Sequence, residues 1–82
     1  MNIKAEIEHF VLNNLLIGNS RTKIDPDESL IADGIIDSLA LLQLIAFIEE
    51  QFAITVEDDE VVPENFQTIT MMSSLVERKL QI

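Results

Sequence analysis

The sequence contains no cysteine, no tryptophan and no tyrosine, and it has only two glycines and two prolines among its 82 residues. Without cysteine, the chain cannot form a disulfide framework, a thiolate zinc site or a cysteine nucleophile. Glycine and proline, which interrupt helices and strands, are scarce, and 48% of the residues are hydrophobic. The chain is therefore too apolar to remain disordered. We therefore expect a single folded domain over residues 1–82, with a radius of gyration of about 12 Å.

Basic residues are also scarce. Five Lys and Arg stand against fifteen Asp and Glu, which gives a formal net charge of -10 at pH 7. A charge of this sign opposes binding to nucleic-acid phosphates and to anionic membrane surfaces, and it favours partners with basic patches. The composition therefore predicts a protein that binds no nucleic acid.

No hydrophobic run is long enough to cross a bilayer. The longest, Leu39 to Ile48, is interrupted by Gln43 and is well short of the roughly 20 residues that a spanning helix needs. The first ten residues mix charged residues such as Lys4 and Glu6 with apolar ones, which is not the pattern of a secretory signal. We expect a cytoplasmic protein without membrane insertion.

The first part of the chain reads as a helix followed by a long loop. Apolar residues recur at helical spacing over residues 3–17, with Asn2 as a candidate cap and Gly18 where the helix would end. Periodicity is lost over residues 19–37, and a loop of this length in a small domain is expected to be ordered and functional. The apolar residues expected to anchor it to the core are Ile24, Leu30, Ile31, Ile35 and Ile36.

A second helix is predicted over residues 38–52, which contain strong helix formers and neither glycine nor proline. Ser38, or Asp37 before it, is suited to cap its first turn. This helix lacks the polar face of an ordinary surface helix, because Gln43 is the only polar residue between Leu39 and Ile48. Two interpretations fit: a central helix covered on several sides, or a partly exposed docking surface.

The remaining chain predicts two further helical segments. An acidic run follows the second helix, a short strand over residues 53–56 is possible, and Pro63 can open a single helical turn through Phe66. Thr68 or Thr70 can cap a last helix that carries basic residues at its end. The apolar stripe of that helix consists of Ile69, Met72, Val76 and Leu80.

Charge along the second helix is confined to Glu49 and Glu50, and no basic residue lies between Lys23 and Arg78. The simplest interpretation is a solvated acidic helix end. Together with the net charge, it also indicates a surface that steers basic partners into transient, salt-sensitive complexes.

Ser38 lies at the start of the second helix, directly after the long loop. As a catalytic nucleophile it needs a base, and the only histidine, His9, lies in the first helix without a recognisable orienting partner. As an acceptor of a phosphate ester it is better placed, because the anion would sit at the positive end of the helix dipole. A plain capping serine remains the alternative that position alone cannot exclude.

The segment from Asp33 to Phe52, DGIIDSLALLQLIAFIEEQF, resembles the phosphopantetheine attachment segment of acyl and peptidyl carrier proteins. The tripeptide Asp37-Ser38-Leu39 matches the family signature. The resemblance extends to the length, the acidity, the long first loop, a short third helix and a closing fourth helix. It implies an all-α four-helix bundle with three main helices and one short third helix.

The resemblance implies a non-catalytic carrier. A phosphopantetheinyl transferase, assisted by Mg²⁺, would attach 4'-phosphopantetheine from coenzyme A to Ser38, and the arm would carry acyl or aminoacyl groups as thioesters. By the same resemblance, Asp37 helps the transferase and its metal to engage the serine, and Leu39 contacts partner enzymes. Further partners would be a loading ligase and downstream acyltransferases, synthases or condensing enzymes with basic and apolar docking patches.

Two positions depart from the carriers of fatty acid synthesis. Those carriers place acidic residues early in this helix, whereas this chain has Ala40 and Gln43, and only Glu49 and Glu50 keep the acidic pattern. The segment EDDEVVPENFQTI, residues 57–69, resembles the third-helix region of discrete aminoacyl, D-alanyl, polyketide and nonribosomal peptide carriers. The pathway implied is a polyketide, nonribosomal peptide, aminoacyl or specialised lipid pathway. We therefore expect a stand-alone carrier of a dedicated pathway, recognised by partners through Asp37, Leu39, Ala40, Gln43, Glu49 and Glu50.

Three other interpretations have some basis in the sequence. A calcium loop at Asp25, Asp27 and Ser29 fails because Leu30 stands where the loop needs glycine. A two-carboxylate hydrolase fails because the acids lie in polar runs that give no reason for a pKa perturbation. The rival that remains is an unmodified helical interaction module that docks through its apolar second helix. We expect a monomer, with weak dimerisation through that helix left open.

Overall fold

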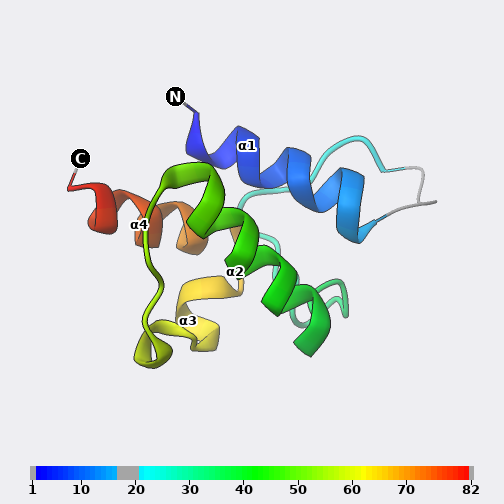
Figure 1. Cartoon of the computed structure of the whole chain (residues 1–82). Helices are drawn as coiled ribbons and strands as arrows, with labels where there is room; N and C mark the ends of the chain where they lie inside the picture. The colour runs from blue at the N-terminus through cyan, green and yellow to red at the C-terminus, as the bar shows by residue number, and fades with distance from the viewer. Residues whose placement is uncertain (1, 17–20, 82) are drawn as a thin grey trace.

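The computed structural model describes residues 2–16 and 21–81, and every element within them is helical (Figure 1). Their order is α1 (Ile3–Phe10), η1 (Val11–Leu15), α2 (Ser38–Phe52), η2 (Asp58–Glu60), α3 (Pro63–Phe66) and α4 (Ile69–Leu80). The Cα radius of gyration is 11.7 Å, close to the predicted value. The all-α prediction, with three main helices and a short third one, is confirmed.

The first helix begins as predicted but changes its geometry before it ends. The Asn2 side chain accepts a hydrogen bond of 3.0 Å from the Ala5 N–H and so caps α1. From Val11 the turns widen into the π-helix η1, in which the Leu16 N–H donates to the Val11 carbonyl over 3.0 Å. Residue 17 and the predicted end at Gly18 lie outside the described residues.

The loop before α2 is anchored in the core, as predicted, but not by all of the expected residues. Ile24, Leu30 and Ile36 are buried, and the Leu30 N–H donates to a backbone carbonyl just before α4. Ile31 is 37% exposed, so its assignment to the core is wrong. The reason is a tight turn in which the Gly34 N–H donates to the Ile31 carbonyl, with Gly34 at a φ of +78°.

Helix α2 spans the predicted residues 38–52. It begins at Asp37, whose carboxylate accepts a 2.8 Å hydrogen bond from the Ala40 N–H, so Asp37 and not Ser38 is the cap. It ends where Ala53 turns into the left-handed region at a φ of 55° and donates its N–H to the Glu49 carbonyl. Ser38 is therefore the first residue of the helix itself.

The segment between α2 and α3 contains no strand among the described residues, so the short strand considered over residues 53–56 is wrong. The acidic run instead folds into the 3-10 turn η2, closed by reciprocal bonds between Glu57 and Glu60. Lys79 of α4 pairs with Glu60 at 2.6 Å. This ion pair ties the acidic turn to the last helix.

The predicted single turn α3 opens with Pro63, and α4 follows directly. Thr68 caps α4 by accepting a 3.1 Å hydrogen bond from the Met71 N–H. Arg78 and Lys79 lie in its last turn, as predicted. Helix α4 lies below α1 at the left of Figure 1, and it packs against α1 and α3.

The core lies where α1, α2 and α4 meet and is closed by α3 and the long loop. Residues of the predicted α4 stripe are buried there, except that Leu80 is only partly buried. Among the described residues, no helix is long and apolar enough to span a membrane. The largest fully buried side chains are Phe66, Ile7, Leu30, Leu44, Ile48, Ile69, Met72, Leu75, Val11 and Val76.

Candidate functional site

Ser38 stands exposed at the point where the anchored loop meets α2. Its hydroxyl makes no hydrogen bond to any other described residue, because the capping bond is made by the neighbouring Asp37. The loop fixes the position of the serine, because Ile36, two residues before it, is buried in the core. A free, exposed hydroxyl on a rigid support is the arrangement that a group-transferring enzyme can reach.

The first turn of α2 also leaves backbone donors unused. The Asp37 carboxylate takes the Ala40 N–H, and the Asp37 carbonyl takes the Leu41 N–H at 2.8 Å. The N–H groups of Ser38 and Leu39 donate to no other described residue. Orphan N–H groups at a helix start, with the positive end of the dipole behind them, favour an anion on the serine oxygen.

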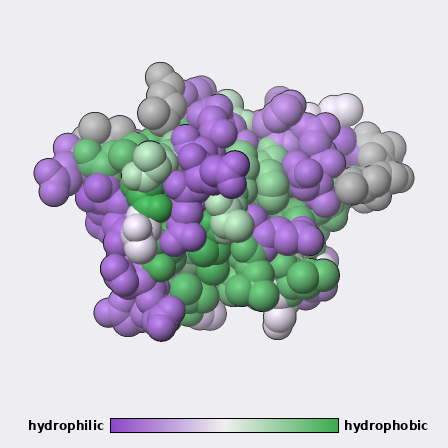
Figure 2. Space-filling model, in the orientation of Figure 1, coloured by the Kyte–Doolittle hydropathy of each residue, from purple (hydrophilic) through white to green (hydrophobic). Residues whose placement is uncertain are grey.

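Large apolar side chains border the serine. Leu39 is 64% exposed and Leu42 is 65% exposed, and Gln43 is exposed beside them. Figure 2 shows the apolar surface gathered over the beginning of α2, with polar surface over α1 and the acidic turn. Both earlier interpretations of α2 hold at once, because one face is buried and the other presents leucines to solvent.

Ala40 does not belong to that exposed face. Its side chain is only 7% exposed and points toward the core, so its expected place on the recognition surface is wrong. The reason is helical geometry: Ala40, Leu44 and Ile48 follow one another at four-residue spacing on the buried side of α2. Substituting Ala40 would test packing rather than docking.

The two glutamates at the end of α2 differ. The Glu49 carboxylate accepts a 2.9 Å hydrogen bond from the Val56 N–H and is partly buried, so it fixes the chain reversal after the helix. Glu50 is exposed and makes no hydrogen bond to another described residue. The interpretation of a solvated acidic end therefore applies to Glu50 only.

An ionic cluster in the loop was not predicted. Arg21 donates to both carboxylate oxygens of Glu28, at 2.8 and 2.6 Å. These hydrogen bonds lower the pKa of Glu28 from 4.5 to about 2, while the hydrogen bond that Asp33 shares with Glu28 raises the pKa of Asp33. The cluster steadies the loop that leads to Ser38. Sequence spacing gave no signal for it, because irregular backbone sets these contacts.

The residues of the calcium-loop and hydrolase interpretations take part in local contacts. The Asp25 side chain accepts a 2.9 Å hydrogen bond from the Asp27 N–H, which makes a local turn rather than a calcium loop. Within residues 2–16 and 21–81, no group of three or more side chains is placed to hold a metal ion. The perturbed carboxyls Glu28 and Asp33 are engaged with Arg21 and each other.

Known proteins are similar to this chain over most of its length. The family model described as phosphopantetheine attachment site matches residues 15–76, which include Ser38. An acyl carrier protein of Exiguobacterium sibiricum is 33% identical over 64 residues, 78% of each chain. One from Nitratidesulfovibrio vulgaris (strain Miyazaki F) is 33% identical over 60 residues, 73% of this chain and 76% of the relative.

Two solved structures are similar over most of the chain. A chain from a structure described as a crystal structure of an FAD-dependent dehydrogenase has a TM-score of 0.77 at 31% identity, covering 85% of this chain and 97% of that one. The structure described as KstB-PCP (apo) has a TM-score of 0.73 at 33% identity, covering 90% and 81%.

Members of this family are non-catalytic carriers with a covalently attached 4'-phosphopantetheine group. The residues at the start of α2 fit such a group, because an exposed hydroxyl stands beside unused N–H donors that would receive a phosphodiester. When attached, the group supplies the thiol that a chain without cysteine lacks. The chain belongs to the family of phosphopantetheine-bearing acyl and peptidyl carrier proteins.

Proposed function

We propose that Ser38 is the attachment residue and that the chain presents acyl or aminoacyl thioesters to the enzymes of a dedicated pathway. The observation that carries this proposal is the exposed hydroxyl without a structural role at the first residue of α2. The Asp37 cap and the anchored loop hold Ser38 in this position.

Each residue at the start of α2 has a part in this proposal. Ser38 Oγ supplies the oxygen of the phosphodiester. The N–H groups of Ser38 and Leu39 stabilise its negative charge together with the helix dipole. Asp37 uses one carboxylate oxygen as the helix cap, which leaves the other to engage the metal of a phosphopantetheinyl transferase.

Partner enzymes are proposed to dock on the exposed side of α2. Leu39, Leu42 and Gln43 form this surface, here called the leucine face, and Glu50 lies further along the same helix. Exposed leucines of this size mark a contact surface, and the net charge of -10 steers basic partners toward it. The arm gains from such docking because tethering raises the local concentration of its cargo.

The dedicated pathway is inferred from what the leucine face lacks. Its early turns carry leucines and the neutral Gln43 rather than carboxylates, so recognition there is apolar. The similarity to the structure described as KstB-PCP supports the same choice. Loading ligases and downstream acyltransferases, synthases or condensing enzymes are the proposed partners. We propose that residues 1–82 act as one carrier domain, as a cytoplasmic monomer.

Intact-mass analysis tests the proposal. The purified apo protein is incubated with coenzyme A, Mg²⁺ and a phosphopantetheinyl transferase of broad specificity. We expect the mass of one phosphopantetheine group to be added to the wild type and to the control Ser74→Ala, whose serine lies on α4, and not to Ser38→Ala. A mass gain in Ser38→Ala would place the site elsewhere. No gain in the wild type would favour the unmodified interaction module.

A further inference from the structure

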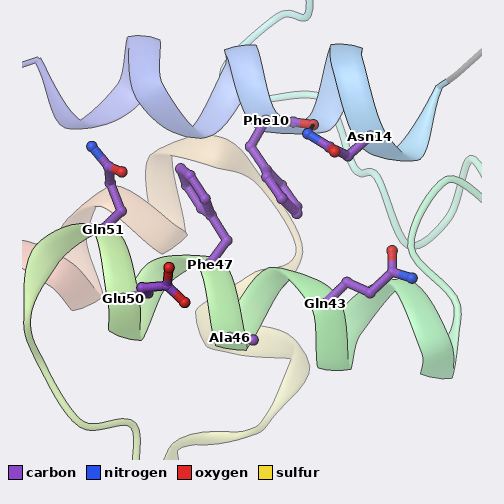
Figure 3. A pocket seen from close by; sticks show the side chains of 7 residues that line it. All are labelled: Phe10, Asn14, Gln43, Ala46, Phe47, Glu50 and Gln51. Atoms are coloured by element: carbon purple, nitrogen blue, oxygen red, sulfur yellow. Dashed lines mark hydrogen bonds between the residues drawn. The ribbon is translucent and has the colours of Figure 1, made fainter.

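A groove of about 500 Å³ lies between α1 and α2, next to the leucine face. We call it the α1–α2 groove. Figure 3 shows two aromatic rings, one from each helix, between side chains with polar ends. The groove is lined by Phe10, Asn14, Gln43, Ala46, Phe47, Glu50 and Gln51.

The floor of the α1–α2 groove is a fixed aromatic pair. The rings of Phe10 and Phe47 stack with centroids 4.3 Å apart and planes 19° apart. Phe52 meets Phe47 edge-on at 6.2 Å and holds it in place from the core side. Both stacked residues are only partly buried, so part of each remains open to a ligand.

The rim of the groove presents hydrogen-bond acceptors. The Gln51 amide nitrogen is turned toward α1 and donates to the Glu6 carboxylate at 2.9 Å, and the Asn14 amide nitrogen donates to the Phe10 carbonyl at 3.1 Å. Three acceptor groups at the rim accept no hydrogen bond from another described residue: the amide oxygens of Gln51 and Asn14, and the Glu50 carboxylate. The rim therefore offers acceptors and negative charge.

The π-turn η1 explains why Asn14 takes this position. In a π-turn each N–H donates to the carbonyl five residues back rather than four, so the carbonyls of the preceding α-helical turn exchange their usual backbone donors for later ones. The side chains of Asn13 and Asn14 donate to two of these carbonyls, those of His9 and Phe10. The widened turn thus places an amide at the rim and fixes which of its atoms is engaged.

We propose that the α1–α2 groove receives an arginine side chain from an enzyme that docks on this carrier. A guanidinium group has five donors and no acceptor, which matches a rim of acceptors. Its planar cation also packs on open aromatic rings. A carboxylate is repelled by Glu50 and the nearby Glu6, and an alkyl group would leave the rim acceptors without a donor.

This inference rests on the proposed function, because it requires that partner enzymes bind the chain as a carrier. It deepens that function by naming a chemical group through which such an enzyme binds. Gln43 borders both the groove and the leucine face, so one partner can contact both at once. The groove then adds a charged contact of defined geometry to the apolar one. The chemistry of the partner is thereby specified as an arginine that projects beside an apolar patch.

The test uses the unmodified chain of residues 1–82, so its result is independent of any result at Ser38. Nuclear magnetic resonance titration with N-acetyl-arginine-methylamide follows the side-chain amides of Asn14, Gln43 and Gln51. The neutral, nearly isosteric probe N-acetyl-citrulline-methylamide serves as the ligand control. We expect saturable shifts at these amides with the arginine probe and none of comparable size with the citrulline probe.

Two matched variants sharpen the titration. Glu50→Gln removes one charge from the rim, and Glu77→Gln removes one charge from an exposed position on α4. We expect Glu50→Gln to weaken binding of the arginine probe by about three-fold, as for an exposed ion pair, while Glu77→Gln leaves it unchanged. Equal weakening by both variants would reveal non-specific attraction to an acidic protein and would overturn the proposal.

Other occupants give distinct signatures. Shifts of the groove amides on concentrating the protein alone would identify a second copy of the chain. Shifts of these amides when an acetyl thioester on the arm is replaced by an octanoyl thioester, without saturable binding of the arginine probe, would identify the cargo. Either result would contradict the arginine proposal. The mass gain at Ser38, measured separately, would be unaffected.

Discussion

The two ends of α2 use their polar side chains in different ways. At its end, the Glu49 carboxylate is bound to the Val56 N–H, and the chain reverses through Ala53. At its start, the cap is made by Asp37 alone, while Ser38 and the large side chain of Leu39 take no part in holding the fold. Residues that a fold exposes without using them are the ones left for binding and chemistry.

The largest predicted effect compares two leucines of α2 that lie two positions apart. Leu44 is fully buried, whereas Leu42 is 65% exposed. We expect Leu44→Ala to lower the free energy of unfolding by about 3 kcal/mol through lost burial and a cavity. Leu42→Ala should change it by less than about 0.5 kcal/mol and should instead slow acylation by a loading enzyme.

Chemical denaturation followed by far-UV circular dichroism measures this difference, because the chain has no tryptophan or tyrosine to report unfolding by fluorescence. Equal destabilisation by the two leucine variants would remove the distinction between the buried side of α2 and the leucine face.

The second prediction compares neighbours at the start of α2. Asp37→Ala removes the side-chain bond to the Ala40 N–H and should cost about 1 kcal/mol of unfolding free energy. Asp37→Asn keeps an acceptor and should restore most of that loss. Ser38→Ala should stay within about 0.5 kcal/mol of the wild type. A larger loss for Ser38→Ala than for Asp37→Ala would mean that the serine has a structural role.

The third prediction compares the two glutamates at the end of α2. Glu49→Ala leaves the Val56 N–H without its acceptor and should cost about 1 kcal/mol. Glu50→Ala should change stability by less than about 0.5 kcal/mol, because Glu50 bonds to no other described residue. Thermal unfolding of the two variants side by side gives the answer, and a reversed order would contradict this reading of the helix end.

The smallest effect concerns pH and the loop that precedes α2. Hydrogen bonds from Arg21 lower the folded-state pKa of Glu28 from 4.5 to about 2. A lowered carboxyl pKa adds stability that is present above pH 4.5 and is lost as the pH falls toward 2. The raised pKa of Asp33 acts in the opposite sense, so the net change is small.

A carbon-detected titration of the Glu28 carboxyl should show its midpoint near pH 2. In an Arg21→Gln variant we expect that midpoint to rise toward the ordinary value for glutamate. An unchanged midpoint would show that Arg21 does not hold the loop in this way.

Sequence alone predicted the helices well and their contacts poorly. The limits of α2 follow from its capping residues and its strong helix formers, which are local properties of residues 37–53. The burial of Ala40, the bond from Val56 to Glu49 and the aromatic floor of the α1–α2 groove depend on how segments pack. A periodic pattern states that a residue lies on a face but not what covers that face.

For the candidate site, too, the sequence predicted the position of the residue but not its contacts. The Asp37-Ser38-Leu39 signature located the serine through a family resemblance, while geometry was needed to show that the cap belongs to Asp37 and that the serine is free. The widened turn η1 had no recognisable signal, because its Asn pair reads as ordinary helix surface. The groove that it borders was therefore not predicted.

The central claim is that phosphopantetheine is attached at Ser38, and peptide mapping by tandem mass spectrometry tests it most directly. Trypsin is unsuitable because no Lys or Arg lies between Lys23 and Arg78, but cleavage after glutamate releases residues 29–49, which contain Ser29 and Ser38. We predict that fragmentation of this peptide from the modified protein places the added group on Ser38. A group on Ser29, or on any other peptide, would contradict the account.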